Sequence, residues 1–245
     1  MTPVASPFPE KPRRALVTGG AVRVGRAIAL ALARAGMDVA IGYHRSSAAA
    51  ARTVRELESH GVRAAAYSVD LTRPAAAGTL VSQAVKKLGG LDVLVNSAAV
   101  FERTPLTRTT PDQYDRLLNV NLRSVFFCSQ AAARVMAPGG HIVNIGDVGA
   151  SRAWPGYIPY TVSKAGVHAL TRGLAVALRA RGIAVNCVAP GAVLRPPGFS
   201  LARWKAVTRG HEGRPEDVAQ AVLFFATCSP YVTGQVLNVD GGETS

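Results

Sequence analysis

The chain has 245 residues, of which 48% are hydrophobic, and this is enough apolar material for one sizeable core. Its 28 Lys and Arg residues against 15 Asp and Glu residues give a formal net charge of +13, but the basic residues are scattered along the chain. This pattern favours solvated arginine-rich faces and a positive field that attracts anionic ligands, and it argues against nucleic-acid binding. Three isolated cysteines, Cys128, Cys187 and Cys228, predict free thiols with neither a disulfide framework nor a metal site.

The chain lacks the features of a membrane or secreted protein. No stretch reaches about 18 consecutive apolar residues, so no transmembrane helix is expected. Residues 1–12 carry four prolines and no apolar signal-peptide core, and they predict a flexible tail ahead of one domain at 13–245. We therefore expect a cytoplasmic protein with a small-molecule substrate and no membrane partner.

Short apolar runs alternate with longer amphipathic stretches along the chain. Helices are expected over 26–35, 48–60 and 112–136, and a substrate loop with a short helix over 191–214. This alternation predicts a single doubly wound, Rossmann-like α/β domain with a seven-stranded parallel sheet and helices on both faces. The predicted strands are 15–19, 38–44, 64–70, 91–98, 141–146, 183–190 and 235–242.

A glycine-rich turn, TGGAVRVG, runs from Thr18 to Gly25 between the first predicted strand and the first predicted helix. Glycines at this place let the backbone approach a pyrophosphate, which the N-terminus of the helix stabilises with free N–H groups. The second strand ends in His44-Arg45-Ser46. An arginine with hydroxyl neighbours suits the 2′-phosphate of NADPH better than the 2′-hydroxyl of NADH. The alternative is an ordinary solvent-facing arginine at a strand end.

Polar residues also end the third and fourth predicted strands. In sheets of this kind ligands bind beyond the carboxyl ends of the strands, where the strand order reverses. We expect Asp70 to accept a hydrogen bond from the adenine amine, and Asn96 to hold the region of the adenosine ribose and its loop.

Tyr160 and Lys164 stand four residues apart, on one face of a predicted helix. A neighbouring ammonium group favours the phenolate, so we expect the pKa of Tyr160 to fall below its reference value of about 10. Such a tyrosine exchanges protons near neutral pH.

Over roughly residues 13–243 the chain resembles the short-chain dehydrogenase/reductase family. The matches are TGGAVRVG, Asp70, NSAA at 96–99, NVNL at 119–122, YTVSK at 160–164, Pro190-Gly191 and the terminal VTGQVLNVDGG. The resemblance implies that Asn121 supports a proton-relay water, that Tyr160 donates the proton, and that Lys164 binds the nicotinamide ribose. It also implies a homotetramer built partly through the Tyr160 helix. The expected cofactor contacts are Thr18, Gly19, Arg23, Val24, Gly25, His44, Arg45, Ser46, Asp70, Leu71, Asn96, Ser97, Ala98, Lys164, Pro190 and Gly191.

Two residues depart from the commonest family pattern. Arg23 replaces the middle glycine of the turn, and Asp147 replaces the catalytic serine. Together with His44-Arg45-Ser46 and Phe101, they resemble the pteridine reductase branch, in which Phe101 would stack the pterin ring. Ala99 departs from that branch, which usually has a serine there. The alternatives are a loop-capping role for Asp147 and a hydrophobic loop anchor for Phe101.

Reduction of a C=N bond needs a proton at nitrogen alongside a hydride at carbon. Asp147 would relay that proton with Tyr160 or hold the tyrosine hydroxyl in its donating orientation, and Arg23 would bridge the cofactor pyrophosphate and the pterin. We therefore expect NADPH-dependent reduction of pterins or dihydropterins, with dihydrofolate left open, and with Arg23, Phe101, Asp147 and Tyr160 as substrate contacts. The alternatives are a 3-ketoacyl-type carbonyl reductase of the same fold and a non-catalytic NADPH-binding regulator.

Overall fold

Seven parallel strands form one sheet in the order β3-β2-β1-β4-β5-β6-β7 in this computed structural model, which describes residues 13–196, 198–208 and 210–244. All seven predicted strands are confirmed, whereas the predicted tail at 1–12 lies outside the described residues. The strand order reverses between β1 and β4, where a doubly wound sheet opens a crevice for a ligand. The strands are β1 (Arg14–Thr18), β2 (Asp38–Tyr43), β3 (Ala64–Ser68), β4 (Val93–Asn96), β5 (His141–Ile145), β6 (Ala184–Pro190) and β7 (Val236–Val239).

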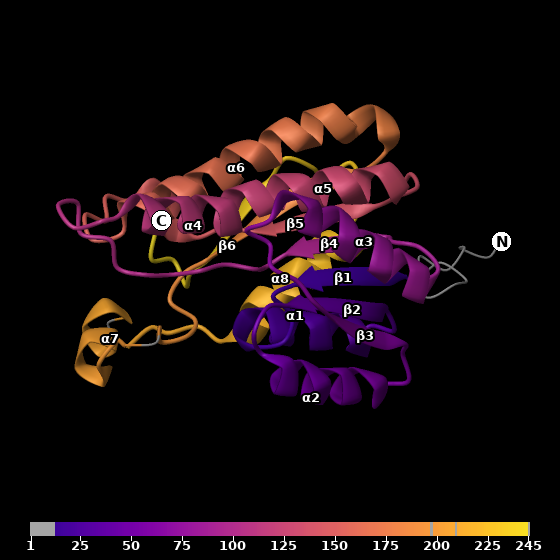
Figure 1. Ribbon diagram of the computed structural model, residues 1–245, viewed down its shortest axis with the longest axis horizontal. Helices are drawn as coiled ribbons and strands as arrows, with labels where there is room; N and C mark the ends of the chain where they lie inside the picture. Colours follow the sequence, from indigo (N-terminus) through magenta and orange to yellow (C-terminus); the bar gives the residue numbers. More distant parts are fainter. Residues whose placement is uncertain (1–12, 197, 209, 245) are drawn as a thin grey trace, which may run out of the picture.

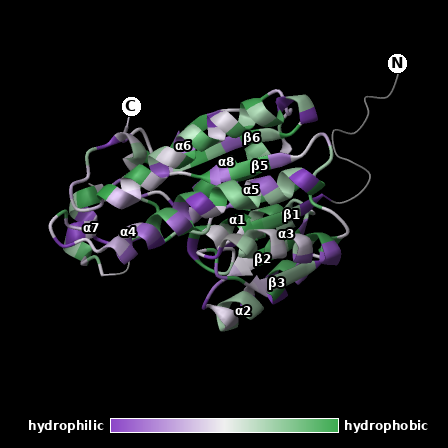
Figure 2. Cartoon of the chain, turned by 45° about the horizontal axis from the view of Figure 1, so that its top comes forward, coloured by the Kyte–Doolittle hydropathy of each residue, from purple (hydrophilic) through white to green (hydrophobic). Residues whose placement is uncertain are grey.

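Helices cover both faces of the sheet (Figure 1). Successive strand residues point to opposite faces, so Val17 belongs to one buried cluster and Leu16 to the other. Hydrophobic residues follow the strands, and hydrophilic residues gather on outer helices such as α4 (Figure 2). The first cluster is covered by α1 (Arg23–Arg34), α2 (Ser47–Glu58) and α8 (Pro215–Thr227), and the second by α3 (Pro74–Leu88), α5 (Ser124–Val135) and α6 (Ile158–Leu178).

The helix expected over 112–136 is not continuous. It consists of α4 (Pro111–Leu118), a π-helical turn at Asn119–Arg123, and α5. A π-helical turn inserts one extra residue into the helical ladder and is frequently found at functional sites. Asn121 lies in this turn and is 1% exposed. Its Oδ1 accepts from the Val100 N–H at 2.8 Å and its Nδ2 donates to the Val100 carbonyl at 2.9 Å, which ties the turn to the loop after β4.

Arginines at the amino edge of the sheet bind the ends of helices. Arg14 donates to the Gly89 carbonyl at 2.6 Å, just after α3, and also pairs with Asp92. Arg63 donates to the Leu88 carbonyl at 2.7 Å. Cations at a helix C-terminus satisfy its last carbonyls and complement its dipole. Part of the excess positive charge therefore stabilises the edge of the sheet that faces away from the crevice.

Loops and short helices follow the carboxyl ends of the strands. A one-turn 3-10 helix at Val148–Ser151 follows β5, and α7 (Leu201–Thr208) is the short helix predicted within 191–214. Figure 1 shows α7 standing away from the sheet on the same side as the C-terminus. None of the helices in the described residues is long and apolar enough to cross a membrane.

Candidate active site

A cavity of about 450 Å³ opens at the carboxyl edge, beside the reversal of strand order. It brings together residues that lie far apart in the sequence and that the sequence patterns single out. Those that line it are Gly19, Arg23, Val24, Gly25, Ser97, Ala98, Phe101, Asp147, Tyr160, Lys164, Pro190 and Gly191. All four substrate contacts predicted from the sequence and nine of the sixteen predicted cofactor contacts therefore meet in one place.

The turn between β1 and α1 is tightly packed. A Cβ on Gly19, whose φ is +67°, would lie 2.9 Å from the Cα of Ala98, and a Cβ on Gly25 would lie 2.2 Å from the Gly19 carbonyl oxygen. No side chain caps the N-terminus of α1, and its first turn holds no acidic residue. Free N–H groups and the positive end of the helix dipole are left for an anion, so the turn fits a pyrophosphate.

Arg23 is the single non-glycine residue with a positive φ, +55°, within the described ranges. An L-residue in this region costs about 1–2 kcal/mol, which a glycine would avoid. Its guanidinium lies 3.4 Å from the carbonyl oxygens of both Leu194 and Arg195. Arg23 therefore links the turn between β1 and α1 to the segment after β6.

The residues predicted to bind the adenosine end lie outside this cavity, after β2 and β3. His44 and Arg45 are exposed, and Arg45 makes no ion pair within the part of the chain that the structure describes. Ser46 precedes α2. Asp70 accepts from the Thr72 hydroxyl at 2.8 Å and the Thr72 N–H at 3.0 Å, and these bonds lower the pKa of its carboxyl group. The next residue, Leu71, is half-buried.

Thr18 and Asn96 do not line the cavity, and their contact with the cofactor stays a prediction. Thr18 is 1% exposed, and its hydroxyl accepts from the N–H groups of Ser97 and Ala98, each at 3.0 Å. Asn96 is 3% exposed and donates to the Asn144 side chain at 2.9 Å. The Thr18 hydroxyl therefore holds the loop after β4 in place, whereas the buried Oδ1 of Asn96 has no hydrogen-bond partner among the described residues.

Tyr160, Lys164 and Asp147 form the reactive group of the cavity. The Tyr160 hydroxyl donates to Asp147 Oδ2 at 2.6 Å, and Asp147 Oδ1 accepts from the Gly149 N–H at 2.7 Å. Lys164 Nζ donates to the Ile145 carbonyl at 2.8 Å and lies 5.9 Å from the centre of the Tyr160 ring. Asp147 thus both caps the turn after β5, as the alternative interpretation expected, and binds the tyrosine.

The pKa values of this group are shifted mainly by burial. Burial raises the pKa of Asp147, although its hydrogen bonds and the charge of Lys164 act in the opposite direction. Burial, and then the charge of Asp147, raise the pKa of Tyr160 well above its ordinary value. The expected lowering of the Tyr160 pKa is therefore wrong for this arrangement, because Asp147 lies against the hydroxyl. Tyr160 remains protonated at neutral pH and is a proton donor.

Asn121 stands behind the cavity. Besides its two bonds to Val100, its Nδ2 donates to the Ser163 hydroxyl at 3.2 Å. These contacts hold Val100, the residue before Phe101, so Asn121 shapes the wall of the cavity. Its support of a proton-relay water stays a prediction.

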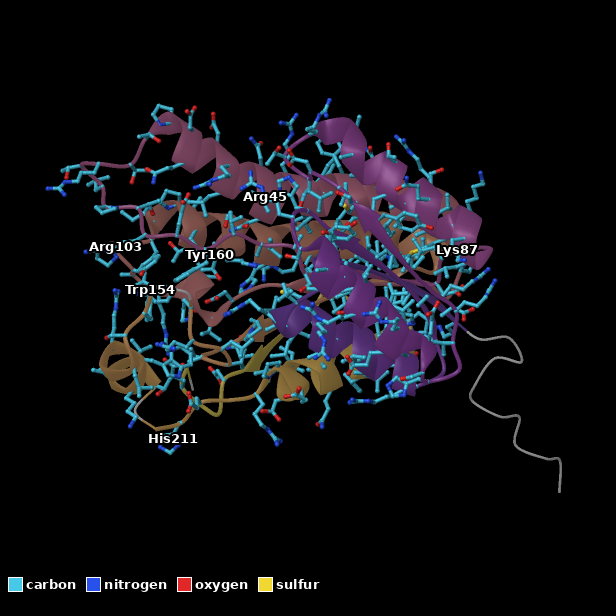
Figure 3. All side chains as sticks on the ribbon, turned by 60° about the horizontal axis from the view of Figure 1, so that its bottom comes forward. Arg45, Lys87, Arg103, Trp154, Tyr160 and His211 are labelled. Carbon is cyan, nitrogen blue, oxygen red and sulfur yellow. The ribbon has the colours of Figure 1, made fainter. Side chains whose placement is uncertain are left out.

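Aromatic rings build the outer wall. Phe101 stacks on Tyr157 with ring centres 4.7 Å apart and meets Tyr160 edge-on at 4.8 Å. Trp154 belongs to the same cluster, and Figure 3 labels it close to Tyr160. Phe101 is thus a loop anchor that also faces the cavity. Trp204 of α7 lines the cavity too, and the sequence analysis missed it because a short helix in an aperiodic loop carries no signal of its direction.

Fold and cavity together define an oxidoreductase site of the dinucleotide-binding α/β class. A family profile described as enoyl-(acyl carrier protein) reductase matches residues 20–244. A curated relative, the 3-oxoacyl-[acyl-carrier-protein] reductase of Synechocystis sp., is 36% identical over 93% of this chain and 95% of its own length. The chain belongs to the short-chain dehydrogenase/reductase family.

Solved structures agree with this assignment. A short-chain dehydrogenase from Burkholderia cenocepacia, determined in complex with NADP, is 39% identical, with a TM-score of 0.90 over 95% of this chain and 98% of that one. A blue fluorescent protein from a metagenomic library, in complex with NADPH, is 40% identical, with a TM-score of 0.88 over the same shares. The Rossmann-like fold predicted from the sequence is confirmed.

Proposed function

We propose that the protein is an NADPH-dependent reductase in which Tyr160 delivers the proton. The observation that carries this proposal is the buried Tyr160 hydroxyl, one helical turn from Lys164, in the same cavity as the glycine turn. The two solved relatives bound to NADP and NADPH support the choice of cofactor. NADPH, when bound, supplies the hydride. The turn from Gly19 to Gly25 would hold its pyrophosphate, Arg45 its 2′-phosphate and Lys164 its nicotinamide ribose.

The chain's own residues would manage the proton. Tyr160 is protonated at neutral pH and donates to the heteroatom of the substrate. Negative charge then develops on the phenol oxygen, and the Lys164 ammonium group, 5.9 Å from the centre of the Tyr160 ring, would stabilise it. Asp147 holds the tyrosine hydroxyl in one orientation through its 2.6 Å hydrogen bond.

A carbonyl compound of the 3-oxoacyl type is the leading substrate class. The Synechocystis relative carries that activity in its name and matches nearly the whole chain. A carbonyl oxygen accepts a hydrogen bond from Tyr160, and the adjoining wall of Phe101 and Trp204 suits an apolar chain. The comparisons thus favour this class over the pterin expected from the branch-like residues.

A cyclic C=N bond, as in a dihydropterin, is the second candidate because of Asp147. A serine donates to a carbonyl oxygen, whereas a carboxylate only accepts. An ionised Asp147 would pair with an N–H group of a nitrogen heterocycle. If its raised pKa keeps it protonated, it would instead supply a proton to a ring nitrogen. Phe101 offers this flat ring an aromatic wall.

A substrate panel separates these candidates. NADPH oxidation is measured with an acetoacetyl thioester, dihydrobiopterin and dihydrofolate, using wild type, Asp147→Ser and Tyr160→Phe. We expect the thioester to be reduced fastest, and Asp147→Ser to raise the ratio of thioester to dihydropterin turnover. Tyr160→Phe should lose about 10²–10⁴-fold in turnover with every substrate while still binding NADPH.

Three outcomes would change the assignment. Faster turnover of dihydrobiopterin in wild type would reverse the ranking of the two substrate classes. A Tyr160→Phe variant with near-full activity would remove Tyr160 as the donor. NADPH binding without turnover of any substrate would leave the non-catalytic NADPH-binding regulator.

A further inference from the structure

An ion pair joins two segments that are remote in the sequence. Arg152, which ends the 3-10 turn after β5, donates from Nη1 to Glu243 Oε1 at 2.6 Å and from Nη2 to the Glu243 carbonyl at 2.8 Å. Glu243 lies in the C-terminal segment after β7. Two donors of one guanidinium fix both the side chain and the backbone of Glu243, so the segment is held in one position.

This pair lies next to the reactive group. Asp147 lines the active-site cavity and also a second cavity of about 830 Å³, whose wall includes Arg152 and Glu243. The C-terminal segment also packs against the turn after β6, because a Cβ on Gly191 would lie 2.7 Å from the Cβ of Asp240. The segments that follow the neighbouring strands β5, β6 and β7 therefore meet behind Asp147.

Ionisable groups face Asp147 from α6 and from the C-terminal segment. Tyr160 and Lys164 approach it from α6 and Glu243 from the C-terminal segment, and Glu243 adds to the rise in the Asp147 pKa that burial causes. The other ionisable groups on the second cavity are Arg152, His211 and Asp240. Arg152 is the one Lys or Arg among the described residues that line the second cavity. The charge of Arg152 also helps to lower the pKa of Asp240.

We propose that Arg152 and Glu243 are positioning residues that set how tightly the Asp147–Tyr160 pair holds its proton. The Glu243 carboxylate opposes loss of a proton from the pair, and the Arg152 guanidinium favours it. In the intact ion pair the two charges act on Asp147 in opposite directions, and the effect of Glu243 is the larger. Removing the charge of Glu243 should therefore lower the pKa of the Asp147–Tyr160 pair, and removing the charge of Arg152 should raise it. The two shifts should have opposite signs although both changes break the same contact. The kinetic test of this proposal rests on the proposed function, in which Tyr160 delivers the proton during reduction.

The pH profile of kcat for reduction tests the proposal. The reaction consumes a proton from the pair, so activity falls as pH rises through the pKa of the pair. Glu243→Gln should move the falling limb to lower pH, and Arg152→Gln should move it to higher pH. Each shift should be about half a pH unit, the size of a screened Coulomb interaction over several ångströms. Arg152→Lys keeps the charge and should restore the wild-type limb.

A matched ion pair elsewhere supplies the control. Arg26 and Glu56 pair between α1 and α2 with side chains 43% and 38% exposed, against 40% and 36% for Arg152 and Glu243. Glu56→Gln should leave the limb where it is. A purely structural role for the Arg152–Glu243 contact would lower kcat in both variants without moving the limb, or would move it in one direction in both. Either result would overturn the proposal.

A second readout needs no substrate. Carbon-13 NMR follows the titration of the Asp147 carboxyl group, assigned by comparison with Asp147→Asn. The Asp147 midpoint should fall in Glu243→Gln and rise in Arg152→Gln. If these midpoints move while no substrate is reduced, the proposed function fails and the positioning role stands. If they do not move, the positioning role fails whatever the enzyme reduces.

Discussion

Arg45 lies exposed after the end of β2, with no carboxylate partner in the described ranges of the chain. A charge-assisted bond to a 2′-phosphate contributes about 1.5–3 kcal/mol, so we expect a preference of about ten- to a hundredfold for NADPH over NADH. Arg45→Ala should abolish it, as measured by the ratio of kcat/KM for the two cofactors. Arg52→Ala, on the exposed side of α2, is the control. Equal ratios in wild type and Arg45→Ala would contradict this role.

Single residues show where sequence reasoning succeeds and where it stops. Tyr160 and Asp147 meet as expected, because a helix face and a strand end restrict their positions before packing is considered. The direction of the Tyr160 pKa was predicted wrongly, because the prediction considered the Lys164 charge and left out burial and the charge of Asp147. Thr18 and Asn96 sit at the right strand ends, but their side chains turn inward to partners that the sequence does not reveal.

The turn joining β1 to α1 depends on a close approach of backbone to backbone. A Cβ on Gly25 would meet the Gly19 carbonyl at 2.2 Å, and no side-chain rotation relieves a clash with backbone. Gly25→Ala should therefore lower the free energy of unfolding by about 1–3 kcal/mol, as overpacking typically does, and should weaken NADPH binding. Urea unfolding and NADPH titration measure the two effects.

Gly78 in the middle of α3 provides the contrast. A Cβ there would meet nothing within 4 Å. Gly78→Ala should stabilise the protein by about 0.5–1 kcal/mol, because alanine restricts the unfolded chain and favours a helix. Equal changes in the free energy of unfolding for Gly25→Ala and Gly78→Ala would show that the turn does not depend on the close approach at Gly25.

Strands and helices were predictable where the hydrophobic pattern of the sequence alone determines them. The strands are short apolar runs ended by polar residues, and the ends of β5 and β6 match expectation within one residue. The π-helical turn at Asn119–Arg123 escaped notice because the apolar pattern continues through it. Its position is explained by tertiary contacts, since the amide of Asn121 binds both backbone groups of Val100.

Apolar side chains on the long helices indicate how whole molecules associate. Phe126 of α5 and Val162 and Val176 of α6 are 40%, 47% and 72% exposed. We expect a homotetramer in which α6 packs against α6 of a neighbouring copy, since a two-fold interface uses the same patch twice. Light scattering should give the mass of four chains for wild type and less for Val176→Asp. Ser82→Asp, on the outer face of α3, should remain tetrameric. A monomeric wild type would exclude this assembly.

The C-terminal segment has a practical consequence for handling the protein. Glu243 is bound by Arg152 beside Asp147, whereas Arg13 lies at the opposite edge of the sheet, where it donates to the Gly139 carbonyl at 3.1 Å. A bulky group attached close after Glu243 would crowd the wall of the second cavity. Arg13, where the described residues begin, lies at the edge of the sheet away from this cavity. Purification through the amino terminus is therefore the arrangement under which the kinetics of the native enzyme should be recorded.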